Sequence, residues 1–129
     1  MAKITNHVKK INRITTLVIR AIESCFEKPE IYEVKSGFDQ SNFSIEVNAF
    51  IFSDKFIRIS TNAQDVNVCL KSFIDKVLEL INDIIDDLQK MEKEYTSSIE
   101  RYGQALTESS AIQLSSSLMF KRIIESIKI

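Results

Sequence analysis

The sequence is poor in the residues on which catalytic and metal sites are commonly built. Its 129 residues include two glycines, one proline, two cysteines, one histidine and no tryptophan. Two glycines, Gly37 and Gly103, are too few for a phosphate-cradling loop or a nucleophile elbow. The single histidine, His7, has no cysteine or carboxylate at the spacing of a zinc site. We therefore expect a non-enzymatic protein without metal or cofactor.

The cysteines and the apolar runs favour a cytoplasmic protein. Cys25 and Cys69 both fall on apolar faces of expected helices, and two thiols are too few for the disulfide framework of a small secreted domain. No apolar run approaches the ~18 residues that span a bilayer, and the N-terminus has no apolar signal-peptide core. We expect both thiols to be buried and reduced, and no membrane partner.

Charge is balanced overall but unevenly distributed. The chain has 17 basic and 18 acidic residues, so net charge gives no argument for nucleic acid. Residues 1–36 contain seven basic and four acidic side chains, whereas residues 65–102 contain five basic and nine acidic ones. The sequence therefore predicts a polarised molecule, basic at its start and acidic along the segment 65–102.

That acidic segment is expected to be one long helix. It has no glycine or proline, Asp65 is a good N-cap, and Gly103 is a natural stop. Its apolar residues recur in steps of three and four, with one lapse at Ser98, which is the pattern of a heptad seam. The apolar face is wide up to Leu88 and narrows beyond it, so we expect the second half of the helix to extend past the domain.

The rest of the chain predicts an α+β domain of order (β)αβββα, with an antiparallel sheet and two helices on one face. Residues 2–8 are expected to form a strand or an ordered arm, and residues 12–28 an amphipathic helix that Asn12 caps and Pro29 ends. Residues 31–35 and 43–51 are expected strands separated by a turn-like stretch, 37–42. Further strand and helix signals occupy 56–61 and 111–129.

We divide the chain into an α+β domain, residues 1–90, and a helical extension, residues 91–129. The last helix is expected either to fold back on the long helix as a hairpin or to form a coiled coil with a second chain. A homodimer is the preferred alternative. The candidate residues for this partner or dimer interface share an apolar stripe on the two helices: Met91, Tyr95, Ile99, Tyr102, Phe120, Ile123, Ile124 and Ile127.

Basic residues near the start of the chain are the best candidates for binding a ligand. Arg13 and Arg20 are seven residues apart and therefore share one outer helix face. Together with Lys9 and Lys10 they can contact phosphates through charge-assisted hydrogen bonds. An ordinary solvated surface is the alternative. The phenylalanines fit the periodicity of a core, and we do not expect them to stack on bases.

Two motifs resemble the ribosome hibernation-promoting factors, also called ribosome-associated inhibitors, over residues 4–90. Ile4-Thr5-Asn6-His7 is similar to the opening strand of that family. The second motif is Ile57-Arg58-Ile59-Ser60, followed by Ala63-Gln64-Asp65 and Ile74-Asp75-Lys76, which resembles its last strand and second helix. The family has the order βαβββα.

The resemblance implies binding to the small ribosomal subunit and its RNA, in the path of messenger and transfer RNA, which stabilises idle ribosomes. Its matching basic positions are Lys9, Lys10, Arg13 and Arg20 on the first helix and Lys71 and Lys76 on the second. The acidic residues from Asp83 to Glu94 depart from the family pattern and face phosphate unfavourably. The alternative is a protein-interaction module, such as a secretion-type chaperone, an immunity protein or an assembly adaptor, that acts through the long helix as a dimer.

Overall fold

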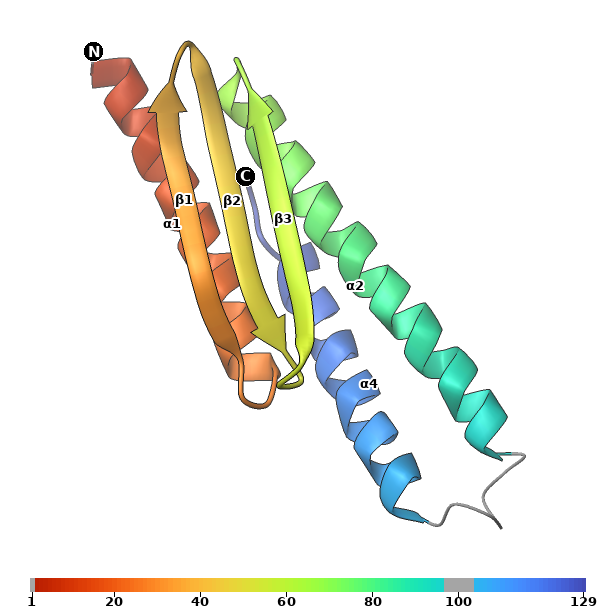
Figure 1. Cartoon of the computed structure of the whole chain (residues 1–129). Helices are drawn as coiled ribbons and strands as arrows, with labels where there is room; N and C mark the ends of the chain where they lie inside the picture. The colour runs from red at the N-terminus through yellow and green to blue at the C-terminus, as the bar shows by residue number, and fades with distance from the viewer. Residues whose placement is uncertain (1, 97–103) are drawn as a thin grey trace.

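The computed structural model describes residues 2–96 and 104–129, and in this part of the chain it is an α+β fold (Figure 1). The elements follow the order α1 (Ala2–Cys25), β1 (Glu30–Asp39), β2 (Asn42–Ile51), β3 (Lys55–Ala63), α2 (Val66–Thr96) and α4 (Gln104–Glu125). The strands form an antiparallel sheet of order β1-β2-β3. One face of this sheet carries the helices, and no helix of the described residues covers the other face.

The core lies between the sheet and the helices because each element is amphipathic. In β2, Phe43, Ile45, Val47, Ala49 and Ile51 alternate with polar residues and are all buried. The long helix contributes the first part of its seam, Ile74, Val77, Ile81, Ile84 and Leu88. The alternating apolar residues of β2 and the apolar seam of α2 up to Leu88 are therefore buried, as the sequence predicts.

The start of the chain is helical, so the expected strand or arm at residues 2–8 is wrong. Helix α1 begins at Ala2 and runs through Asn12 without interruption. Ile4, Val8 and Ile11 continue the apolar spacing of the helix toward the N-terminus, and Ile11 is fully buried. Asn12 caps no helix; its side-chain oxygen accepts a hydrogen bond from the Ser36 hydroxyl at 2.7 Å.

The first strand is longer than the sequence predicts. Gly37 and Phe38, expected in a turn, pair with Ser44 and Phe43 in β2. The turn is confined to Gln40 and Ser41, whose φ angles are both positive at 51° and 69°. Because two residues of positive φ make the tight hairpin turn that matches strand twist, the strands continue up to it on both sides.

The C-terminal helix α4 runs back along α2 and also contacts α1, so three helices rather than two cover the sheet (Figure 1). Phe120 and Ile124 are buried in the same core as the sheet, and Ile123 and Ile127 pack against that core. These four residues, expected at an interface between chains, therefore complete the core of their own chain. The core thus extends past residue 90.

Of the remaining interface candidates, Met91 is the one whose side chain the structure describes. Met91 is 39 % exposed. Ile99, Tyr102 and the side chain of Tyr95 lie outside the described residues, as does the course of the chain between α2 and α4. The heptad seam is therefore observed as a packed helix face up to Leu88.

Candidate functional site

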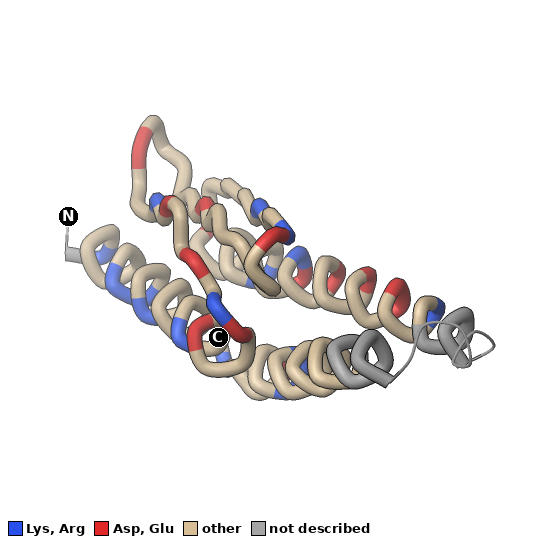
Figure 2. The backbone as a smooth tube through the Cα atoms, turned by 60° about the horizontal axis from the view of Figure 1, so that its bottom comes forward, with Lys and Arg blue, Asp and Glu red and all other residues tan. Residues whose placement is uncertain are grey.

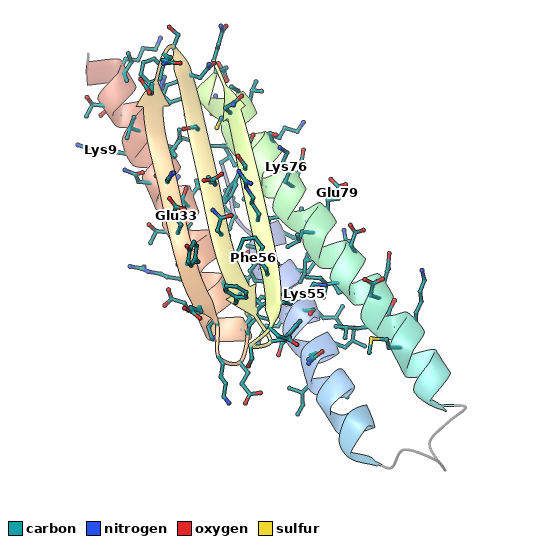
Figure 3. The ribbon with its side chains drawn as sticks, in the orientation of Figure 1. Lys9, Glu33, Lys55, Phe56, Lys76 and Glu79 are labelled. Carbon is teal, nitrogen blue, oxygen red and sulfur yellow. The ribbon has the colours of Figure 1, made fainter. Side chains whose placement is uncertain are left out.

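Three of the five basic residues of α1 lie on the helix face that points away from the core. Helix α1 contains Lys3, Lys9, Lys10, Arg13 and Arg20 but one acidic residue, Glu23. At 100° per residue, Arg13 and Arg20 lie almost opposite the buried Ile14, Val18 and Ile22. Both are exposed, as is Lys9, which Figure 3 shows projecting from α1 away from the strands.

Helix α4 adds cations that sequence reasoning did not include. Arg122 is exposed on the side of α4 opposite the buried Phe120 and Ile124, and Lys128 is exposed just beyond the helix. Helix α4 contacts α1 on the side of the sheet that carries the helices, and we infer that residues opposite the buried faces of these two helices share one outer surface. We call Lys9, Arg13, Arg20, Arg122 and Lys128 the basic surface.

Lys10 and Lys71 lie at one end of the helices that cover the sheet. The Lys10 ammonium donates a hydrogen bond to the Asn67 side-chain oxygen at 3.0 Å, which joins α1 to the first turn of α2. Lys71 is one helical turn after Asn67 and is exposed. The structure therefore brings Lys71 to the end of α2 that Lys10 of α1 contacts.

Lys76 lies elsewhere. Its ammonium donates a hydrogen bond to the Ser60 carbonyl oxygen at 2.5 Å, on the edge of β3. Figure 3 shows Lys76 and Glu79 on the flank of α2 beside that strand. Lys76 is thus separated from the α1 residues by the width of α2, and it cannot share one phosphate-binding face with them.

The charges are separated along the fold (Figure 2). Lysine and arginine recur along α1, whereas aspartate and glutamate recur along α2. In the described part of the chain, ion pairs join Lys35 to Glu33 and Arg58 to Glu46, both on the sheet, and none involves α1. Lys9, Arg13 and Arg20 of α1 are therefore exposed and form no ion pair within the described residues, which is the arrangement that attracts phosphate.

The uncovered face of the sheet carries aromatic residues that sequence reasoning placed in the core. Phe50 and Phe56 pair across β2 and β3 on this face, with ring centroids 5.2 Å apart. Phe56 is 50 % exposed and is seen on the face in Figure 3. Phe50 falls between the buried Ala49 and Ile51, so the period of the strand already places it on the otherwise polar face.

Two pockets lie along one flank of α2, the first beside the edge of β3 and the second beside the turn between β2 and β3, where Gln113 of α4 also lines it. The first pocket, of about 380 Å³, is lined by Arg58, Ile59, Ser60, Lys76, Glu79, Leu80 and Asp83. The second pocket, of about 330 Å³, is lined by Phe52, Asp54, Lys55, Ile84, Asp87, Leu88, Met91 and Gln113. Both pockets have an apolar floor and charged rims. We call the two together the edge groove.

His7 packs against Phe43, near the start of the central strand β2, with ring centroids 5.7 Å apart. Across residues 2–96 and 104–129, no three histidine, cysteine or acidic side chains lie close enough to hold a metal ion. Within the same residues, none of the helices combines the length and apolar character that crossing a bilayer requires. Neither thiol is activated, because burial raises the pKa of Cys25 and of Cys69.

Comparisons with protein-family models, with curated proteins and with solved structures found no match to this chain.

Proposed function

We propose that this protein is a non-enzymatic factor that binds RNA through the basic surface, and that its target is the small ribosomal subunit. The observation that carries the proposal is the row of exposed cations on α1, which form no ion pair within the described residues. Cations without an ion-pair partner bind phosphate most favourably, because no carboxylate must first be displaced from them. The acidic flank of α2 faces another direction and does not interrupt this row.

The ribosomal target is supported by the second of the two resembling motifs. Ile57-Arg58-Ile59-Ser60 lies in β3, and the Asp65 carboxylate caps α2 by accepting hydrogen bonds from the backbone N–H groups of Asn67 at 2.9 Å and Val68 at 3.1 Å. This is the junction of last strand and second helix that the resemblance implies. The first motif gives no such support because its residues are helical.

Co-sedimentation with purified small ribosomal subunits tests the proposal. At about 50 mM salt the protein should pellet with the subunits, and binding should fall steeply as salt rises because phosphate contacts release counterions. The variant Arg13→Glu with Arg20→Glu should not pellet. The matched control is Lys55→Glu with Lys90→Glu, which makes the same charge change away from the basic surface. Equal binding by both variants, or no binding by the wild type, contradicts the proposal.

A second candidate function is a protein-interaction module acting as a homodimer or adaptor. Exposed apolar side chains on α4 favour it: Ile112 is 58 %, Leu118 42 % and Met119 48 % exposed. Apolar side chains grouped on one helix commonly mark a contact with another protein. Light scattering should then give a dimer mass, and Met119→Glu should reduce it to the monomer. A concentration-independent monomer that recovers no stoichiometric, nuclease-insensitive partner contradicts this function.

A further inference from the structure

β3 is an edge strand, and within the described residues no further strand pairs with its outer side. The Ser60 carbonyl oxygen is directed toward α2, where it accepts a hydrogen bond from the Lys76 ammonium. In an antiparallel ladder, alternate residues direct both backbone groups to the same side. Phe56, Arg58 and Asn62 therefore also turn their N–H and C=O groups away from β2. This edge presents the pattern that an added strand needs.

The edge groove provides a surface beside those backbone groups. Along α2, its lining residues Lys76, Leu80, Ile84, Leu88 and Met91 recur every three or four positions, so they lie on one flank of the helix. From Lys76 to Met91 this flank is about 22 Å long at 1.5 Å per residue. An extended segment of about seven residues has the same length.

The uncompensated charges of the edge groove are mainly acidic. Arg58 is engaged by Glu46, whose carboxylate accepts its hydrogen bond at 2.8 Å, and the Lys76 ammonium is engaged by the Ser60 carbonyl. The ion pairs that the described residues form include none of the groove's carboxylates, which belong to Asp54, Glu79, Asp83 and Asp87. Lys55 is the cation that remains beside them. An occupant of matching charge is therefore basic.

We propose that the edge groove binds an extended segment of a partner protein as a fourth strand, with apolar residues over the groove floor and lysine or arginine facing the α2 carboxylates. The proposal rests on the second function above, since it names the binding site and the chemistry of the partner segment. A second copy of this chain paired through β3 fits less well. A second copy would bring its own groove, with the same excess of carboxylates, to the contact, so the two charges would not be complementary.

A peptide-display experiment tests the site with the full chain. A random library of short linear peptides is selected on the immobilised protein, and the enriched peptides are synthesised for affinity measurement. Enriched sequences should alternate apolar residues with lysine or arginine. Asp83→Lys with Asp87→Lys should weaken their binding by about tenfold. Asp75→Lys with Asp86→Lys is the matched control, because both residues are exposed on α2 outside the groove.

Methylation of single peptide amides distinguishes strand addition from simple charge attraction. N-methylation at alternate positions should abolish binding, and N-methylation at the intervening positions should leave it intact, because an added strand donates every second N–H to its neighbour. Failure to enrich any peptide, enrichment of acidic sequences, equal loss in the two lysine variants, or tolerance of methylation at every position overturns the proposal.

The failure of this inference is distinguishable from the failure of the functions proposed above. If a stoichiometric protein partner is retained equally by wild type and by the Asp83→Lys, Asp87→Lys variant, the adaptor function stands and the edge groove is not its site. The Arg13→Glu, Arg20→Glu variant should bind the selected peptides with unchanged affinity. A loss of affinity in that variant would show that the peptides bind the helices instead of β3.

Discussion

The rings of Phe26 and Phe120 pack with their centroids 5.1 Å apart, which joins the end of α1 to α4 across almost the whole sequence. Phe52, at the end of β2, meets Phe26 edge-on at 5.2 Å. Three segments therefore meet in one aromatic cluster at the end of the core. This cluster is where the C-terminal helix becomes part of the domain, because Phe120 is only 3 % exposed.

Replacing Phe120 with alanine should lower the free energy of unfolding by about 3 kcal/mol, because it removes a buried ring and leaves a cavity between α1 and α4. Urea denaturation followed by circular dichroism measures the change. Met119→Ala is the matched control, since Met119 is 48 % exposed, and it should change the stability by no more than about 0.5 kcal/mol. Unchanged stability together with a smaller oligomer would instead place Phe120 between chains.

Because both thiols are buried, the free energy of unfolding should fall as the pH becomes alkaline. Burial raises the pKa of Cys25 and Cys69 above the ordinary 9.0, and the Cys69 thiol donates a hydrogen bond to the Phe43 carbonyl at 3.5 Å, which favours its neutral form. The unfolded chain therefore ionises first. Stability should be complete below pH 9.0 and fall as pH rises through the raised pKa values of the folded state.

Two measurements check this prediction. Urea denaturation between neutral and alkaline pH should show the decline, and Cys25→Ala with Cys69→Ala should lessen it. At neutral pH, modification of the native protein by a thiol reagent should be slow and limited by opening of the structure. Rapid stoichiometric labelling of Cys69 in the folded protein would show that this thiol is not enclosed.

The sequence predicts the elements that are strongly periodic. It misses those whose form depends on contacts with distant parts of the chain. The alternation in β2 and the seam up to Leu88 identify a strand and a helix because each has one buried face. The beginning of α1 is missed because Asn12 is a plausible cap and Thr5, Asn6 and His7 are poor helix formers. The apolar contacts of Val8 and Ile11 with the core decide in favour of the helix.

The candidate site was predictable in part. The spacing of Arg13 and Arg20 places both on one helix face from the sequence alone. The contribution of Arg122 depends on where α4 docks, which local pattern does not determine. The position of Lys76 depends on a hydrogen bond to Ser60, sixteen residues away, and no spacing rule gives it. Sequence reasoning cannot predict those residues of the candidate site that tertiary contacts bring together.

The hairpin between β1 and β2 should become more stable when its turn residues suit positive φ. Gln40 and Ser41 have φ angles of 51° and 69°, a conformation that asparagine and glycine adopt at lower cost. Gln40→Asn with Ser41→Gly should raise the free energy of unfolding by about 0.5–1 kcal/mol. Thermal unfolding measures it. Ser44→Gly, in β2, is the control and should lower stability, so a loss in both variants would contradict the turn geometry.

The cations of α4 should contribute to RNA binding as much as those of α1 if the basic surface is one interface. Arg122→Gln with Lys128→Gln removes two positive charges, and for every phosphate that is no longer neutralised the slope of log affinity against log salt should fall by about 0.7 to 0.9. The slope for small-subunit binding should therefore fall by about 1.5. Lys55→Gln with Lys90→Gln should leave it unchanged. If the α4 variant keeps the wild-type slope while Arg13→Gln with Arg20→Gln lowers it, RNA binds α1 alone.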